Sequence, residues 1–376
     1  MKIQRIFMTS VTRTKRLNRK LFASICCGLF ICCFSLLLLI EKSFTKNESM
    51  RRDAEACYGS LTKHKNEYEI RYLEDIMEAQ KKPNAGNSIF FHETTCSRSG
   101  LVHLNSRQAC AIESAAKLNP NRDIFVLFAS PVGFREIDSN LPPNIKALKN
   151  YPNIHFRNNN VWKYAEGTPA EKWMQTGTLF ESSYLFEHMS DVLRYVTLYK
   201  FGGVFMDLDI VVQKNLDYLG ENFAGDDSVD AIGCGVLHFD NDKLGRQIAD
   251  NCLRFMATHF NGKTFIDNGP LVITRTLEKL CKTTNRSLMT REQCDGFQVY
   301  PKNTFYAVSW KNWHWFFDPK MVNETLALTE NSAIIHVWND VSKKAKLRIG
   351  SHTAYEIAAR KNCPKTYYSR INFEYF

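Results

Sequence analysis

Four charged residues in the middle of the chain have types and spacings that could do chemistry. Asp191 and Arg194 lie three positions apart in a helix-like segment, so they share one face of it. Asp207 and Asp209 lie two positions apart in a strand-like segment, and period-two alternation points both carboxylates to the same side. Two carboxylates within an apolar strand repel each other and are costly to bury unless a cation neutralises them.

Mg²⁺ and Mn²⁺ accept carboxylate ligands of this kind and complete their coordination with phosphate oxygens. A bound cation then stabilises negative charge that builds up on a diphosphate leaving group. The pattern therefore predicts a site for a divalent cation and a diphosphate. A bare D-x-D pair is a weak motif, and its structural alternative is a solvated turn or an ordinary strand end.

The segments that carry these residues have recognisable boundaries. Ser190 is expected to be the N-cap of the helix, and Gly202-Gly203 is expected to end it because glycine accepts the left-handed conformation at little cost. Residues 204–212 are expected to form one continuous strand.

The elements around this block predict an α/β fold. A strand at 88–92, a helix at 105–118 capped by Asn105 or Ser106, and a strand at 123–129 follow one another, an order typical of a parallel sheet. Ligands of such sheets bind at the carboxyl ends of the strands. Residues 158–189 are expected to be irregular and aromatic. Further strands are predicted at 153–157, 229–239 and 333–338, and further helices at 243–259 and 269–281.

The N-terminal region predicts a membrane anchor. Residues 21–40 are twenty uncharged, mostly apolar residues, which in a helix span about 30 Å, the thickness of a bilayer core. A cleaved signal peptide is the alternative, but its apolar region is usually shorter and ends in a small-residue cleavage site. Seven basic residues and no acid precede the run, whereas Glu41 and Lys42 follow it directly, and this excess of positive charge places residues 1–20 in the cytosol. We therefore expect a basic tail at 1–20, a signal-anchor helix at 21–40, a stem at 41–87 with a helix around 64–80, and a lumenal body at 88–376.

Charge and cysteine usage agree with this topology. Seven of the ten net positive charges come from Lys and Arg residues before position 21, so the body offers no basic surface for nucleic acid. Eight cysteines lie outside the anchor, and without any C-x-x-C pair this even set favours disulfides over metal sites. Cys281 and Cys294 could close a short loop. Three N-x-[ST] sequons, at Asn47, Asn285 and Asn323, also fit a lumenal glycoprotein.

With these residues assembled, a family resemblance can be stated. The block from Ser190 to Asp209 resembles the signature of glycosyltransferases with the D-x-D sugar-binding motif. Residues 88–376 resemble the lactosylceramide 4-alpha-galactosyltransferase and alpha-1,4-N-acetylglucosaminyltransferase family. The matching segments are 89–94, 110–116, 190–212, 268–270, the stretch around 310–313, and 336–339.

The resemblance implies a GT-A fold, a UDP-sugar donor, Mn²⁺ (or Mg²⁺), retention of anomeric configuration and a type II Golgi membrane protein. It implies that Asp207 and Asp209 hold the metal and the UDP diphosphate, and that Asp191 and Arg194 bind hydroxyls of the donor sugar. His336 is expected to complete the metal or phosphate contacts; its alternative is a satisfied core histidine.

Further site residues follow from the same resemblance. Phe91, Glu93 and Thr94 are expected near the uridine, with core packing as the alternative for Phe91. Asn268 is expected to contact the donor sugar or an oxocarbenium ion, although relatives carry Gln-Gly-Pro where this chain has Asn-Gly-Pro; a helix-start cap is the alternative. A double displacement needs a carboxylate nucleophile and a front-face mechanism does not, so the nature of any nucleophile stays open.

Aromatic residues offer a candidate acceptor face. Trp310, Trp313, Trp315 and the aromatic segment 158–189 could stack against sugars, or they could belong to the core.

The expected activity is transfer of galactose or N-acetylgalactosamine from UDP-galactose or UDP-N-acetylgalactosamine, in α1,4 linkage, onto a glycosphingolipid at the Golgi membrane. The alternatives are alpha-1,4-N-acetylglucosamine transfer to glycoprotein glycans, and an inactive anchored sugar-binding protein of the same fold. The sequence leaves open the donor sugar, the acceptor glycan, the disulfide pairing, the sequon occupancy and the homo- or hetero-oligomeric state.

Overall fold

The computed structural model of the protein describes residues 51, 53–59, 69–135, 141–227 and 231–376. The chain divides into two units, Met1–Asp53 and Ala54–Phe376, and the second contains every element described below. The predicted cytosolic tail, the predicted anchor at 21–40 and the sequon at Asn47 lie outside the described residues. Within the described ranges, no helix is both long enough and apolar enough to cross a membrane.

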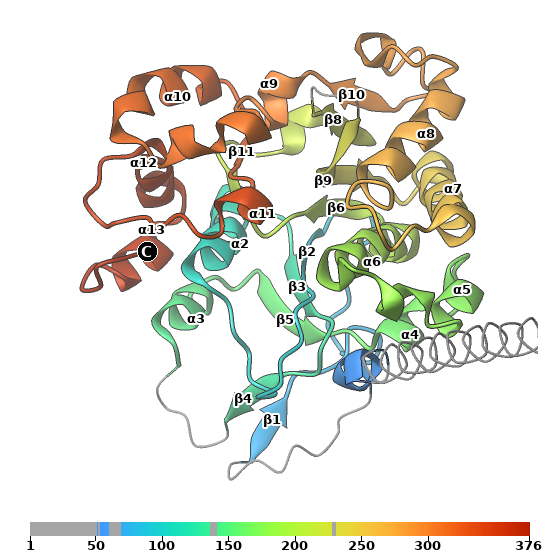
Figure 1. Ribbon diagram of the computed structural model, residues 1–376, viewed down its shortest axis with the longest axis horizontal. Coiled ribbons are helices and arrows are strands. Elements are labelled where there is room, and N and C mark those ends of the chain that lie inside the picture. The colour runs from blue at the N-terminus through green and yellow to red at the C-terminus, as the bar shows by residue number, and fades with distance from the viewer. Residues whose placement is uncertain (1–50, 52, 60–68, 136–140, 228–230) are drawn as a thin grey trace, which may run out of the picture. The chain divides into compact units, whose positions relative to one another are not determined.

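A seven-stranded mixed sheet forms the centre of the second unit (Figure 1). Its strand order is β10-β8-β9-β6-β2-β3-β5, and β9 runs antiparallel to both neighbours while the other pairs are parallel. The predicted α/β class with a mostly parallel sheet is therefore confirmed. The strands are β2 (Ile89–Glu93), β3 (Ile124–Phe128), β5 (Ile154–Asn158), β6 (Gly203–Met206), β8 (Phe223–Asp226), β9 (Ile232–Phe239) and β10 (Gln298–Tyr300).

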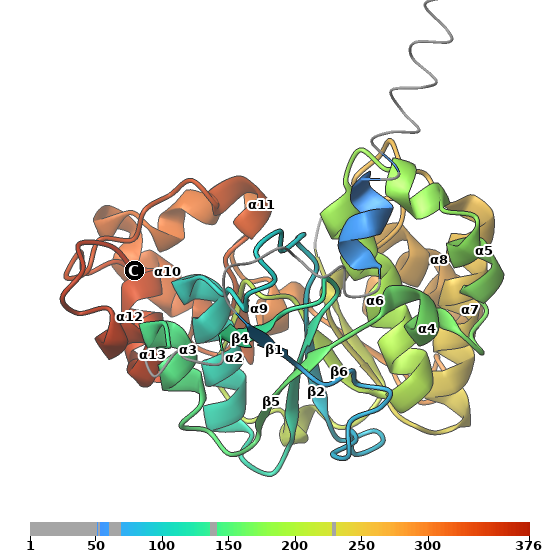
Figure 2. The same ribbon diagram turned by 90° about the horizontal axis from the view of Figure 1, so that it is seen from below.

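Successive side chains of these strands point to opposite faces of the sheet and form a buried apolar layer on each face. Phe90, Phe125 and Phe205 pack on the face covered by α6 (Leu185–Phe201), α7 (Lys243–His259) and α8 (Pro270–Cys281). Val126 and Val204 pack on the opposite face, beneath α2 (Ser106–Leu118) and α3 (Pro143–Leu148). Figure 2 shows these two helical layers on either side of the sheet. Helix α2 begins as predicted, because Asn105 forms a capping box with Gln108.

The remaining elements are short. Two small sheets pair β1 (Ile70–Tyr72) with β4 (Gly133–Arg135) and β7 (Ile210–Val212) with β11 (Ile334–His336). The other helices are α4 (Val161–Ala165), α5 (Glu171–Gln175), α9 (Lys302–Phe305), α10 (Val322–Thr329), α11 (Asn339–Ser342), α12 (Ala354–Asn362) and α13 (Pro364–Ser369). The 3₁₀ helices are η1 (Thr178–Glu181), η2 (Asp217–Leu219), η3 (Arg286–Leu288), η4 (Trp310–Phe316) and η5 (Pro319–Met321).

Two predictions for the central block were wrong. Helix α6 begins at Leu185, not after Ser190, because the apolar face continues backwards through the buried Met189. The predicted continuous strand 204–212 is broken at 207–209, so that β6 belongs to the large sheet and β7 pairs with β11. Gly202 ends α6 with φ +63°, as predicted.

The segment 158–189 is also more regular than predicted. It contains α4, α5, η1 and the start of α6. The reason is tertiary packing: Tyr164 and Phe180 are buried, and Trp162 stacks on Phe180 with ring centroids 5.3 Å apart.

The folded unit begins earlier than residue 88, where the sequence placed the start of the body. Residues 54–58 are helical, Tyr58 is buried in the core, and Cys57 forms a disulfide with Cys96. Residues 70–72 form strand β1 where a helix was expected around 64–80. Much of the expected stem is therefore part of the folded unit.

Disulfides account for six of the eight cysteines outside the predicted anchor. The bonds are Cys57–Cys96, Cys110–Cys363 and Cys281–Cys294, the last as anticipated. Cys234 and Cys252 are free and buried, so the even set is not fully paired.

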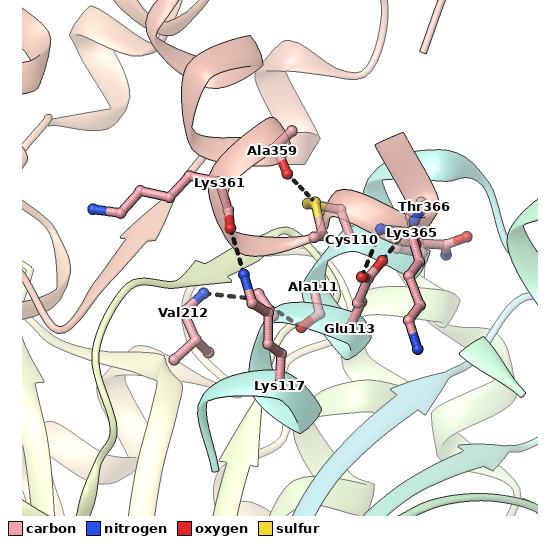
Figure 3. The surroundings of a disulfide bond; sticks show 12 residues. Cys110, Ala111, Glu113, Lys117, Val212, Ala359, Lys361, Lys365 and Thr366 are labelled. Carbon is pink, nitrogen blue, oxygen red and sulfur yellow. Dashed lines mark hydrogen bonds between the residues drawn. A yellow bond between two sulfur atoms is a disulfide. The ribbon is translucent and has the colours of Figure 1, made fainter. Parts of the chain in front are cut away.

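The Cys110–Cys363 bond joins α2 to the start of α13 (Figure 3). Beside it, the buried Glu113 accepts hydrogen bonds from the backbone N–H groups of Lys365 and Thr366 at 2.8 and 2.6 Å. The carboxylate thereby satisfies two amide groups in the first turn of α13. The C-terminal helices are thus fixed to the sheet through α2.

Candidate functional site

The site is organised around the turn Asp207-Leu208-Asp209, which links β6 to β7. The Asp207 N–H donates to Gly235 O of β9 at 2.9 Å, and the Val337 N–H donates to Asp209 O at 3.0 Å. The turn is therefore held between β9 and the end of β11. Since β7 and β11 pair Ile210 with His336, the histidine comes to the same place as the two carboxylates.

Asp207, Asp209 and His336 form a three-ligand cluster. One ligand atom from each residue lies within 4.8 Å of the others. His336 Nε2 lies 3.3 Å from Asp209 Oδ1 and 3.8 Å from Asp207 Oδ2. Two carboxylates and one imidazole suit Mn²⁺ and related divalent ions.

Gly235 leaves open the space that such an ion needs. A Cβ at this position would lie 2.8 Å from Asp207 Oδ2 and 3.2 Å from His336 Nε2. The donor set and the open space together fit a divalent cation.

Backbone groups orient the cluster. The Asn339 N–H donates to Asp209 Oδ2 at 2.6 Å, and the Trp338 N–H donates to His336 Nδ1 at 3.2 Å. Trp338 itself has φ +56°, an uncommon conformation for a bulky residue, and its Nε1–H donates to Val308 O at 2.8 Å. A strained backbone conformation of this kind occurs most often at functional sites, where the surrounding contacts keep it in place.

Burial and neighbouring charges act against each other on the pKa values of these three residues. Burial alone would raise the pKa of Asp207, but Arg194 and His336 outweigh it and hold the pKa below its ordinary value. Burial raises the pKa of Asp209, with His336 acting in the opposite direction and Asp207 adding to the rise. Burial would lower the pKa of His336, but Asp209 and Asp207 raise it above its ordinary value.

Arg194 connects this cluster to Asp191. Its Nη2 lies 2.9 Å from Asp191 Oδ1 and 3.6 Å from Asp207 Oδ1. The guanidinium also donates to Cys234 O at 2.7 Å and to Ser190 Oγ at 3.1 Å, and it lies 4.6 Å from the centre of the Phe205 ring. These contacts fix the Arg194 guanidinium between the carboxylates of Asp191 and Asp207. Asp191 and Arg194 lie on one face of α6, as their three-residue spacing predicted.

Asp191 sits in a nearly dry environment. Burial raises its pKa to about 7, although the neighbouring Arg194 acts in the opposite direction. A Cβ on Gly269 would lie 2.4 Å from Asp191 Oδ1, so the backbone of the 268–270 segment passes directly against this carboxylate.

Glu93 and Thr94 lie at the carboxyl end of β2. The register that pairs Phe90 with Phe205 puts this end beside the Asp207 turn. Glu93 Oε1 accepts from Thr95 N–H at 2.8 Å, and Thr94 Oγ1 donates to Phe186 O at 2.8 Å. Phe91 is wholly buried in the core on the α2 face. A uridine contact by these three residues stays a prediction.

Asn268 is buried, and its side-chain amide bonds the backbone of Asn261 and lies against His188 of α6. Its Oδ1 accepts from Asn261 N–H at 3.0 Å, and its Nδ2 donates to Asn261 O at 2.8 Å. Helix α8 has no side-chain cap at its start, so Asn268 does not serve as one. Its expected contact with the donor stays a prediction.

The aromatic residues proposed for an acceptor face divide into two groups. Trp162, Tyr164 and Trp173 pack onto the core. Trp310 is 42% exposed, and Tyr184 and Phe186 are also exposed.

Sequence reasoning missed Gly235, Cys234 and Asn339, which contribute space, a carbonyl and an amide N–H to the site. The backbone groups of Cys234 and Asn339 leave no signal in residue type, and the need for a glycine at 235 depends on side chains distant in sequence.

Two conserved regions known from other proteins match this chain. Residues 105–225 match the glycosyltransferase sugar-binding region containing the DXD motif, and residues 241–369 match the alpha 1,4-glycosyltransferase conserved region. The first region contains Asp191, Arg194, Asp207 and Asp209, and the second contains Asn268 and His336.

Curated relatives point the same way. The human lactosylceramide 4-alpha-galactosyltransferase is 29% identical over 286 residues, covering 76% of this chain and 77% of that protein. The rat enzyme of the same name is also 29% identical over 286 residues, covering 76% of each chain. The human alpha-1,4-N-acetylglucosaminyltransferase is 25% identical over 337 residues, covering 89% of this chain and 92% of that one.

Among solved structures, the galactosyltransferase LgtC with donor and acceptor sugar analogues is 13% identical with a TM-score of 0.34, covering 74% of this chain and 95% of that chain. A TM-score this low carries no argument, so the fold rests on the sheet topology, which agrees with the GT-A arrangement that the resemblance implies. The two conserved regions and the curated relatives confirm the resemblance of this chain to the alpha-1,4-glycosyltransferases with a DXD sugar-binding region.

Proposed function

We propose that this protein is a type II Golgi enzyme that transfers galactose or N-acetylgalactosamine from a UDP-sugar, in α1,4 linkage and with retention, onto a glycosphingolipid. The observation that carries the proposal is the continuous charged network from Asp191 through Arg194 to Asp207, Asp209 and His336. The names of the galactosyltransferase relatives support the choice of sugar, linkage and acceptor. Three disulfides among the described residues support an oxidising compartment.

In the transfer, the bond between the sugar C1 and the diphosphate oxygen breaks, and a bond from C1 to an acceptor hydroxyl oxygen forms. The diphosphate leaves with the electron pair, and its freed oxygen takes up the proton that the acceptor hydroxyl loses. Asp207, Asp209 and His336 would hold a divalent cation, which when bound supplies Lewis-acid stabilisation of the leaving diphosphate.

Asp191 and Arg194 would bind the donor-sugar hydroxyls. Because Cys234 O and Ser190 fix the guanidinium, the pair is preorganised and little rearrangement is needed when the sugar enters. Glu93 and Thr94, at the carboxyl end of β2, would border the uridine.

Asn268 would hold the loop that packs against Asp191 in place. Both ends of its amide bond to Asn261, which fixes the backbone of Gly269 against Asp191. We therefore assign Asn268 to positioning the donor pocket and propose that retention does not use its side chain as a nucleophile.

The test uses the full chain in lipid nanodiscs with Mn²⁺, a panel of UDP-galactose, UDP-N-acetylgalactosamine and UDP-N-acetylglucosamine, and a lactosyl glycolipid acceptor. Transfer with an α1,4 linkage is expected, together with its loss on chelation of the metal. Asp209→Asn is expected to lower transfer by about 10²–10³-fold, since it weakens the cation site. Asp250→Asn, on the exposed side of α7 and paired with Arg254, is the matched control and is expected to leave transfer unchanged.

Two outcomes contradict the proposal. One is a chain that binds no UDP in the presence of Mn²⁺, which would favour the inactive sugar-binding alternative. The other is an Asp209→Asn protein with full activity.

A second candidate is alpha-1,4-N-acetylglucosamine transfer to glycoprotein glycans. The N-acetylglucosaminyltransferase relative favours it, because that alignment spans more of this chain than the galactosyltransferase alignments do. Use of UDP-N-acetylglucosamine with a glycoprotein acceptor, and of no other donor in the panel, would select this candidate.

A further inference from the structure

Four large apolar side chains gather at the surface beside the site. Tyr184, Phe186, Phe265 and Ile266 are 36%, 42%, 38% and 52% exposed. They come from two segments far apart in the sequence, and the Tyr184 and Phe265 rings meet edge to face at 5.6 Å. We call these four residues the aromatic patch. Grouped exposed apolar residues of this kind mark interaction surfaces more often than scattered ones do.

The two segments that carry the aromatic patch are fixed to each other. The Ser183 N–H donates to Gly262 O at 2.9 Å. The buried His188 joins both segments, because its Nδ1 bonds Ser182 Oγ at 2.7 Å and its Nε2 bonds Thr264 O at 3.1 Å. These hydrogen bonds hold the two segments of the aromatic patch in a fixed arrangement.

The aromatic patch is also continuous with the donor site. Phe186 O accepts from Thr94 Oγ1, at the end of β2. On the other side, His188 Nε2 lies 3.0 Å from Asn268 Nδ2, and the next residue, Gly269, packs against Asp191. The aromatic patch therefore borders the residues that line the proposed donor site.

The N-terminal part of the chain enters the folded unit at the same place. Tyr58 OH donates to Thr94 O at 2.7 Å, and Cys57 is bonded to Cys96, just beyond β2. Thr94 thus contacts both Tyr58 and Phe186.

Only residues 41–53 separate the predicted anchor, which ends at Ile40, from Ala54 of the folded unit. Thirteen residues reach at most about 45 Å when fully extended. With the anchor in a membrane, a connection of this length allows Ala54, and the aromatic patch that neighbours Tyr58 through Thr94, to reach the bilayer surface.

We propose that the aromatic patch docks onto the interfacial region of the lipid bilayer and so presents the donor site to an acceptor whose lipid tail stays in the membrane. Aromatic rings with an apolar body are favoured at the headgroup level of bilayers. The proposal rests on the anchor and the glycolipid acceptor of the proposed function.

The first experiment measures docking without catalysis. Thr264→Cys, an exposed position within the aromatic patch segment, is labelled with an environment-sensitive dye on the full chain in nanodiscs that contain spin-labelled lipids. Tyr218→Cys is the matched control, because Tyr218 is 59% exposed and adjoins Asp217, which pairs with Arg122 at the amino end of β3, opposite the site. Lipid quenching at 264 several-fold above that at 218 is expected. Equal quenching at both positions would overturn the proposal, as would covalent dimers cross-linked through 264, which would assign the aromatic patch to a second copy.

The second experiment measures its consequence. The double variant Phe186→Ser, Phe265→Ser is expected to lower transfer to a bilayer-embedded glycolipid by roughly tenfold and to leave transfer to a soluble lactoside and the affinity for UDP with Mn²⁺ unchanged. Tyr218→Ser is the control. An equal loss with both acceptors would contradict docking. Absence of transfer to every acceptor in the wild-type chain would reject the proposed function, while the quenching result would still decide on docking.

Discussion

Gly235 faces Asp207 and His336 with no side chain of its own, and the cation site depends on that space. Gly235→Ala would place a methyl group between these ligands, where the side chains must move apart to accept it. The expected result is a loss of Mn²⁺-dependent UDP binding of about 10–100-fold with little change in melting temperature. Calorimetric titration with UDP and Mn²⁺ measures it. Gly59→Ala is the control, since its Cβ would approach nothing closer than 3.5 Å; unchanged binding in Gly235→Ala would speak against the metal assignment.

Asp191 makes stability depend on pH in a direction opposite to that of most carboxylates. Its pKa is raised from the ordinary 3.8 to about 7 by burial, so the folded state binds a proton more tightly than the unfolded state. The contribution of Asp191 to stability is therefore largest below pH 4 and is lost as the pH rises towards about 7. From about pH 4.5 to about pH 7.5, the stability of the wild type is expected to fall relative to Asp191→Asn by about 3 kcal/mol.

Urea unfolding of both proteins in metal chelator, at several pH values, measures this difference. A difference that stays constant with pH, or that grows in favour of the wild type, would show that Asp191 is already ionised in the folded protein below neutral pH.

Residue spacing alone was enough to find the charged side chains of the site. Asp191 with Arg194 and Asp207 with Asp209 are local pairs, and helix and strand periodicity brings each pair to one side. His336 came from the family resemblance, because a residue so distant in sequence has no periodic relation to the others. Cys234 and Asn339 could not be found, since they act through backbone groups that any residue carries.

At the level of elements, the strand break at 207–209 shows the limit of pattern reading. Residues 204–212 alternate and are rich in β-branched and apolar side chains, so the pattern favours one strand. The break follows from long-range pairing: β9 binds the Asp207 N–H, and β11 pairs with β7. The prediction for α6 started the helix too late for a related reason. Ser190 is a residue type that often caps helices, but here it lies inside the helix and its hydroxyl accepts from Arg194.

Glu113 permits a test of how α13 is fixed to α2. Its carboxylate accepts from two amide N–H groups of α13 (Figure 3). It also accepts from Tyr151 OH at 2.7 Å. Glu113→Gln would replace one acceptor oxygen by an NH₂ group facing an N–H donor, leaving buried donors unpaired. We expect the free energy of unfolding to fall by about 1–3 kcal/mol.

Urea unfolding measures the effect, with the exposed Glu324→Gln as the control on a neighbouring helix. Equal midpoints for the two variants would show that the Cys110–Cys363 bond alone fixes α13.

For the whole molecule, the disulfides predict a ranking of stabilities. Cys110 and Cys363 are separated by 253 positions and Cys281 and Cys294 by 13. Loop-closure entropy then gives about 5 kcal/mol for the long bond and about 3 kcal/mol for the short one. Replacing each pair by alanine and comparing urea midpoints checks the ranking, with Cys252→Ala as a buried free-thiol control. A larger loss from the Cys281–Cys294 pair would reverse the expectation.

The N-terminal boundary of the folded unit was the feature that sequence composition predicted least accurately. Residues 41–87 are polar and charged, which is typical of a stem, and nothing local distinguishes Tyr58 or Cys57 as core residues. Their roles depend on partners beyond residue 88, namely Thr94 and Cys96. The order and type of the main strands and helices, by contrast, follow from local periodicity and caps, and most of them were predicted correctly.

The bond between Cys110 and Cys363 also makes the catalytic part of the chain a covalent ring. Asp191, Arg194, Asp207, Asp209 and His336 all lie within that ring. A single protease cut anywhere in it opens the ring but separates nothing, so the nicked protein remains one molecule until its disulfides are reduced. Electrophoresis of nicked protein would accordingly show one band of full mass without reductant and two fragments with it.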